Sequence, residues 1–156
     1  MLFTILLFIH LVSVAVWLGG AVYERFVLVR KARNAAGTRL ELELTEMFFS
    51  SAKVLLPAVL ALLLSGIAMT IHAGYSFFGG DWLGFKQSVM AAIILLFHLY
   101  IGPRSKKTMA LVEQDRKNGG TMAEPTRQAF NRLYVGFDII HFGVVLNLIA
   151  AVWQPF

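Results

Sequence analysis

The residues of this chain that could do chemistry are a few ionisable side chains set inside long apolar segments. Such groups are costly within a membrane, so each needs a partner or a function. Asp138 lies three residues before His141, which places both on one face of a helix. The structural interpretation is a salt bridge from Asp138 to Lys86 or Arg132. The functional one is that the carboxylate fixes the imidazole tautomer and makes His141 a better metal ligand.

A stripe of polar and small residues is predicted in the first apolar segment. Its spacing places all members on one helical face, which we expect to be turned toward the other helices. The structural interpretation is close packing, with one hydrogen bond from His10 to a carbonyl. In the functional interpretation His10 ligates a cofactor and Trp17 lines its site. The stripe consists of His10, Ser13, Trp17, Gly20 and Glu24.

Three intramembrane histidines predict b-type haem, which is held by two imidazoles at similar depth on facing helices. With ~1.5 Å of rise per residue, His10, His141 and His98 lie roughly 12, 18 and 24 Å below the outer surface. His10 with His141, or His141 with His98, would then ligate one haem, and His72 would allow a second. Lys86 or Arg132 would meet the haem propionates. Lys86 could equally extend to the outer interface.

Copper is the alternative to haem as the bound group. Met69 and His72 share a helical face, and Met90 follows in the next apolar segment, so these residues could handle copper in transport or resistance. Methionine in a membrane helix more often fills space. A third interpretation is an accessory subunit without a cofactor.

The elements that must position these residues are four transmembrane helices. Apolar side chains make up 58% of the 156 residues and charged ones 15%. The mean hydropathy is +0.69. Each apolar block is near the ~20 residues that span a bilayer. We therefore expect an all-α integral membrane protein, a single four-helix transmembrane domain with helices at about 2–29, 52–73, 82–102 and 128–153.

The net charge of +5 comes from two loops, residues 30–53 and 104–127. By the positive-inside rule both are cytoplasmic and both termini lie outside, as in a multi-pass protein of the bacterial inner membrane. The basic residues are expected to touch lipid head groups and not nucleic acid. We also expect a short amphipathic helix within 30–51, turns at Gly119 and Gly120, and a helix cap from Thr121 or Thr126. The absence of cysteine excludes disulfides, iron–sulfur clusters and covalent c-type haem.

Four short motifs stand out along the chain: His10-x6-Trp17-x-Gly19-Gly20, Leu56-Pro57-Ala58-x7-Gly66, Trp82-Leu83-x2-Lys86 followed by His98, and the final Pro155-Phe156. Together they resemble the HemJ-type four-helix membrane proteins, which are protoporphyrinogen IX oxidases that bind b haem. The resemblance implies an oxidoreductase with His10 and Lys86 at the essential histidine and lysine positions. The first two motifs also resemble the membrane domain of copper-resistance protein D.

The chain departs from the HemJ pattern at two places. An Arg-x2-Asn-Glu-x-Pro signature is replaced by the run Arg132 to Phe137, and Pro-Arg after the first helix is replaced by Glu24-Arg25. His141 is an addition, which favours a bis-histidine electron-transfer cytochrome. Quinone or a tetrapyrrole would then be the redox partner. Four short crossings also suggest self-association or a partner subunit.

Overall fold

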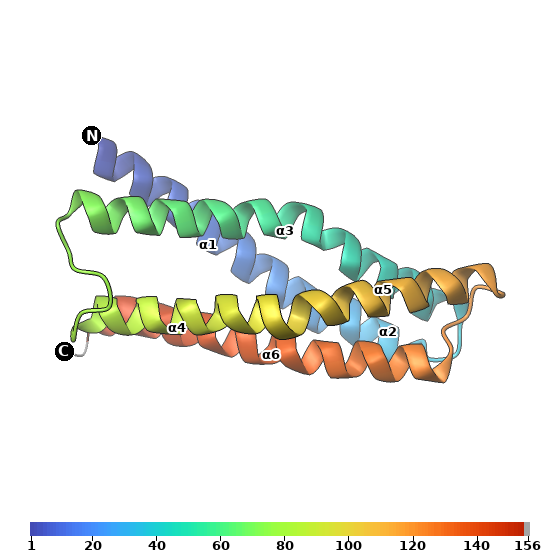
Figure 1. The fold of residues 1–156 in the computed structure, drawn as a ribbon. Helices are drawn as coiled ribbons and strands as arrows, with labels where there is room; N and C mark the ends of the chain where they lie inside the picture. The colour runs from blue at the N-terminus through green and yellow to red at the C-terminus, as the bar shows by residue number, and fades with distance from the viewer. Residues whose placement is uncertain (155–156) are drawn as a thin grey trace. The chain divides into compact units, whose positions relative to one another are not determined.

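The computed structural model describes residues 1–154 and consists of helices joined by turns and loops (Figure 1). Four continuous helical runs, Leu2–Asn34, Arg39–His72, Trp82–Lys117 and Glu124–Trp153, are long and apolar enough to cross a membrane. No strand occurs in the described part of the chain, so the prediction of an all-α, four-helix membrane protein is confirmed. The elements in order are α1 (Leu2–Tyr23), η1 (Glu24–Val29), α2 (Arg30–Asn34), α3 (Arg39–His72), α4 (Trp82–Leu96), η2 (Phe97–Ile101), α5 (Gly102–Lys117) and α6 (Glu124–Trp153).

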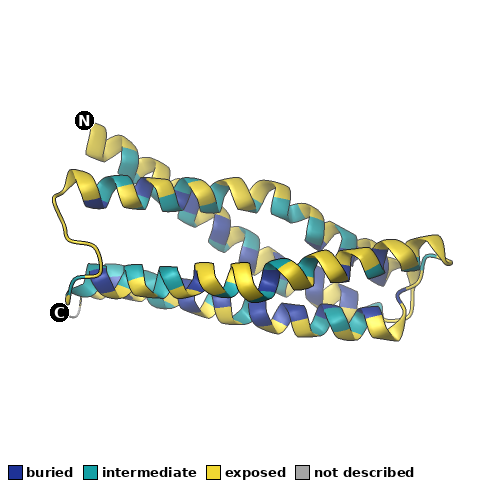
Figure 2. Ribbon diagram, viewed as in Figure 1, coloured by how far each residue is buried: buried dark blue, intermediate teal, exposed yellow. Residues whose placement is uncertain are grey.

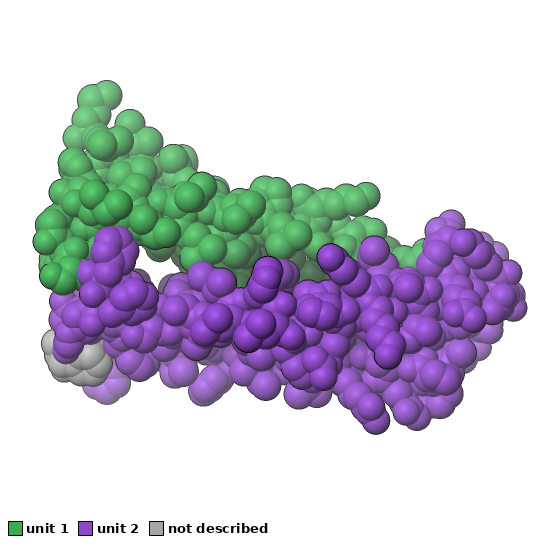
Figure 3. All heavy atoms as spheres, viewed as in Figure 1, with its two compact units in different colours: residues 1–36, 40–76 green, residues 37–39, 77–156 purple. Residues whose placement is uncertain are grey.

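The chain divides into two compact units (Figure 3). Unit 1 comprises residues 1–36 and 40–76, and unit 2 comprises residues 37–39 and 77–156. Each unit is a helical hairpin in which the first helix contains a π-helical segment, η1 or η2. The Pro155-Phe156 motif lies outside the described residues.

Unit 1 is an antiparallel hairpin with one continuous register. The ring of Phe3 stacks on that of His72, with centroids 6.2 Å apart, and further along α1 His10 Nδ1 lies 3.1 Å from Ser65 Oγ. Gly20 lies against Leu55 in the same register. The paired residue numbers rise along α1 and fall by the same amount along α3, as in a regular antiparallel pair. The polar stripe of α1 therefore faces α3 along its whole length.

The helices extend further than the apolar blocks that predicted them. α3 begins at Arg39 instead of near residue 52, so the short amphipathic helix expected within residues 30–51 is not a separate element. Leu42, Leu44 and Phe48 are buried, and they continue the packed face of α3 without a break. The only proline of this helix, Pro57, is tolerated because neighbouring groups in a membrane helix can satisfy the freed carbonyl.

Unit 2 pairs α4 and η2 with α6 through two glycines. A Cβ at Gly143 would lie 3.0 Å from Ile93 Cδ1, and one at Gly136 would lie 3.0 Å from Tyr100 Cε1. These distances are within or below close van der Waals contact, so the backbone of α6 can approach its neighbour only because both positions lack a side chain. Small residues commonly allow membrane helices to pack closely in this way.

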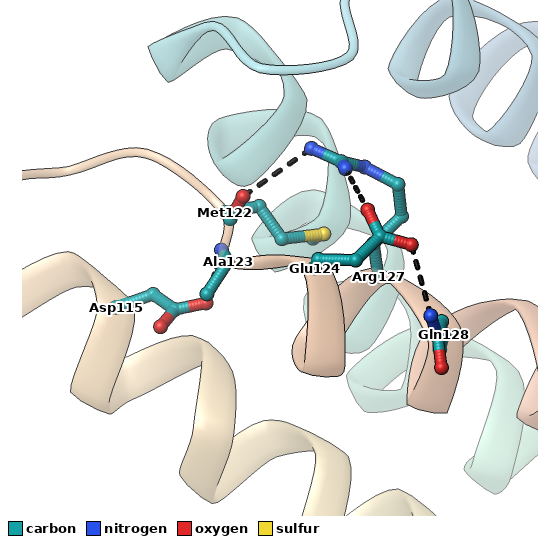
Figure 4. Close-up of polar contacts among 6 residues, drawn as sticks. All are labelled: Asp115, Met122, Ala123, Glu124, Arg127 and Gln128. Atoms are coloured by element: carbon teal, nitrogen blue, oxygen red, sulfur yellow. Dashed lines mark hydrogen bonds and ion pairs between the residues drawn. The ribbon is translucent and has the colours of Figure 1, made fainter.

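The turn before α6 is built differently from the prediction. Gly119 and Gly120 adopt positive φ values of 133° and 76°, as expected for a turn. The residue at the N-cap is Ala123, which makes no side-chain cap, so neither Thr121 nor Thr126 caps the helix. Asp115 instead accepts the Ala123 N–H at 2.9 Å, and Arg127 pairs with Glu124 (Figure 4).

Exposed positions run along all the helices (Figure 2), and many of them carry large apolar side chains. Between 11% and 28% of each apolar window is buried within the chain. Phe8, Leu64, Leu99 and Val152 are examples of strongly exposed residues. Soluble monomers rarely expose so many large apolar side chains together, and on membrane-spanning helices such side chains contact lipid.

Candidate functional site

His10 has a defined tautomer within unit 1. Its Nδ1 lies 3.2 Å from the carbonyl oxygen of Leu62 and 3.1 Å from Ser65 Oγ. The Ser65 hydroxyl lies 2.6 Å from the Ala61 carbonyl and donates to it. Because the Leu62 carbonyl can only accept, Nδ1 carries a proton, and in the neutral imidazole the lone pair is then on Nε2. This is the form of histidine that ligates metals, with the other ring nitrogen held by a carbonyl.

The position of the His10 ring depends on Gly66. A Cβ at Gly66 would lie 3.2 Å from His10 Cε1, closer than most side chains tolerate. Ser13 and Trp17, the next members of the stripe, are buried. The stripe therefore packs on α3 as predicted, and His10 makes the carbonyl hydrogen bond expected from the structural interpretation. In the functional interpretation, the same bond would fix the tautomer of a histidine that ligates through Nε2.

Glu24, the acid at the end of the stripe and the first residue of η1, is buried. It is 4% exposed, and its carboxylate accepts a hydrogen bond from the Ser51 hydroxyl. The same hydroxyl lies 2.6 Å from the Phe48 carbonyl. A protonated Glu24 could therefore donate to Ser51, which would then donate to Phe48. The site accepts either protonation state without leaving a polar group unsatisfied.

His141 ends an aromatic ladder on α6. Ring centroids are 6.3 Å apart from Phe130 to Tyr134, 6.2 Å from Tyr134 to Phe137 and 6.3 Å from Phe137 to His141. Tyr134 is fully buried. The sequence analysis did not identify this ladder, although aromatic residues at three- and four-residue spacing indicate one. Asp138 lies within the same stretch and is half-buried, one helical turn before His141.

The other predicted site residues of unit 2 lie in less enclosed places. Lys86 Nζ lies 5.4 Å from the ring centroid of Trp82, so the amine and the indole form a cation–π pair. His98 is exposed and lies within η2, and Arg132 is exposed on α6. Asn147, which the sequence analysis did not single out, has a buried Oδ1 without a hydrogen bond to any described residue.

The proposed copper residues are divided between the units. His72 and Met69 lie one turn apart on α3, where the exposed His72 ring stacks on Phe3. Met90 lies on α4. Among residues 1–154, no group of three or more histidine, aspartate or glutamate side chains is arranged to hold a metal ion.

A family of predicted integral membrane proteins, DUF2269, matches residues 4–153. The chain belongs to this family. No curated protein and no solved structure matches the chain. The DUF2269 match agrees with the four apolar helices and gives the general class, an integral membrane protein. The match does not support the more specific resemblance to HemJ-type oxidases or to copper-resistance protein D.

Proposed function

We propose that this DUF2269 protein is a membrane-embedded redox protein that binds b-type haem, with Nε2 of His10 as an axial ligand. The observation that supports this is the hydrogen bond from His10 Nδ1 to the Leu62 carbonyl, 3.2 Å away. It holds the imidazole in one orientation with a proton on Nδ1, which lowers the cost of ordering a ligand when the cofactor binds.

The residues of the chain fit such a group in their chemistry. In unit 2, His98 and His141 are the other candidate axial ligands, and Asp138 is the group that would orient His141. Lys86 or Arg132 would neutralise propionates. When bound, haem would supply one-electron transfer at a potential set by its axial ligands and by the surrounding dielectric. The physiological partner would be a tetrapyrrole, as in HemJ-type oxidases, or a quinone, as in an electron-transfer cytochrome of the cytoplasmic membrane.

An optical spectrum tests this proposal. Protein purified in detergent from haem-replete cells should show a Soret band and, after dithionite reduction, sharp α and β bands. His10→Ala and one of His98→Ala and His141→Ala should lose these bands, while His72→Ala serves as the matched control and should keep them. A featureless spectrum of the unaltered protein would overturn the proposal and leave copper transport or an accessory role.

A further inference from the structure

Three arginines line an open hollow at the inner end of the first helical run. The hollow has a volume of about 290 Å³ and is lined by Arg25, Phe26, Arg30, Arg33 and Asn34. This volume is close to the lower end of the roughly 300–1,000 Å³ found for small-molecule sites. Guanidinium groups recognise phosphate through two parallel hydrogen bonds. We propose that this hollow binds the phosphate head group of an anionic phospholipid.

The π-helical segment η1 is what gathers these side chains. In a regular α-helix, residues five apart point about 140° away from each other. A π-helical turn joins residues five apart by its hydrogen bonds, so η1, which spans Glu24–Val29, brings Arg25 above Arg30. Arg33 follows one α-helical turn after Arg30. The opposite face of this stretch is packed, because it carries the buried residues Leu28, Val29 and Ala32. The hollow therefore stays on the exposed face of the helix.

The hollow also lies at the depth of lipid head groups. About 20 residues of helix cross the hydrocarbon layer. The run Leu2–Asn34 contains 33 residues, so its last third, which holds the three arginines, emerges into the head-group region. By the positive-inside rule this is the cytoplasmic face, where anionic lipids attract basic segments. The apolar ring of Phe26, which is 64% exposed, would lie beside the first acyl carbons.

Lipid binding in this hollow and non-specific attraction by surface charge predict different effects of the same charge loss. Lys31 is exposed on the same short helix α2, between two of the arginines in the sequence, but it does not line the hollow. Lys31→Gln therefore removes the same charge as Arg30→Gln without touching the site. Arg30→Lys with Arg33→Lys keeps the charge and removes the paired hydrogen bonds of the guanidinium.

The experiment measures retention of phosphatidylglycerol by the full-length protein in detergent, using native mass spectrometry and a titration of phosphatidylglycerol into mixed micelles. Arg30→Gln should weaken binding by more than about 10-fold, because it removes paired hydrogen bonds as well as a charge, whereas Lys31→Gln should weaken binding by about fivefold or less, the loss expected from one surface charge. The double lysine variant should also bind weakly. Phosphatidylcholine and inorganic phosphate should not compete.

Two results would overturn the proposal. Equal losses for Arg30→Gln and Lys31→Gln would show that only the surface potential attracts lipid. Competition by inorganic phosphate at the same concentration would show an anion site without lipid preference. The haem spectrum of these variants should be unchanged, because the hollow lies at the far end of the helix from His10, so the outcome is separate from that of the proposed redox function.

Discussion

The hydroxyl of Ser51 on α3 donates a hydrogen bond to the carboxylate of Glu24, at the residue where α1 passes into the π-helical segment η1. Glu24 is buried, and Ser51 is its hydrogen-bond partner across the hairpin. A buried acid inside a membrane helix is stable only with such a partner. The pair therefore joins the two helices of unit 1 near the turn that connects them.

Removing this partner should destabilise the protein. Ser51→Ala should lower the free energy of unfolding by about 1–3 kcal/mol, because the buried carboxyl loses its donor. Glu24→Gln should lower the free energy of unfolding by a smaller amount, because the amide oxygen of glutamine still accepts the hydrogen bond from Ser51. Unfolding in a denaturing detergent, followed by tryptophan fluorescence, measures both. The control is Ser88→Ala, whose hydroxyl donates 2.9 Å to the Gly84 carbonyl of its own helix. If Ser51→Ala lowered the free energy of unfolding by no more than Ser88→Ala does, the prediction would be contradicted.

Two adjacent glycines of α1 should respond in opposite ways to the same change. A Cβ at Gly20 would overlap the side chain of Leu55, while one at Gly19 would meet no atom within 4 Å. Gly20→Ala should therefore cost about 1–3 kcal/mol of unfolding free energy. Gly19→Ala should be neutral or stabilise by up to about 1 kcal/mol. Leu55→Ala combined with Gly20→Ala should recover part of the loss, and additive losses would show that the two residues are not in contact.

The sequence predicted the helical class and the packed stripe of α1 because both depend on local patterns. Apolar block length indicates a membrane crossing, and the spacing from His10 to Glu24 indicates one helical face. Helix ends were less predictable. The hydrogen bonds of α3 continue through charged residues as far out as Arg39, whereas the apolar block begins only at Val54.

The partners of the site residues could not be predicted from the sequence. Ser65 and Ser51 meet His10 and Glu24 only through the register of the hairpin, which is set by a turn containing Gly37 at φ +80°. The π-helical segments leave no recognisable sequence signal either. Without η1, Arg25 and Arg30 would have been placed on different faces of the helix.

Ser65 should tune a cofactor bound at His10. Ser65→Ala removes one of the two acceptors near His10 Nδ1 and leaves the Leu62 carbonyl. The imidazole becomes less basic, so cofactor affinity should fall by about 10-fold or less, and the midpoint potential should rise because the oxidised iron is less stabilised. A redox titration followed at the α band measures this. Ser51→Ala is the control in the same hairpin and should leave the potential unchanged. A potential unaffected by Ser65→Ala would remove Ser65 from any positioning role.

The orientation in the membrane can be tested with single cysteines, because the natural chain contains none. Tyr75→Cys lies in the exposed segment after α3, and Asn118→Cys lies in the exposed turn after α5. The basic segments on either side of Asn118 should keep it in the cytoplasm. A membrane-impermeant maleimide should therefore label Tyr75→Cys in intact cells and Asn118→Cys only after permeabilisation. Labelling in the reverse order would place Arg25, Arg30 and Arg33 on the outer face, and the argument for a cytoplasmic lipid site would fail.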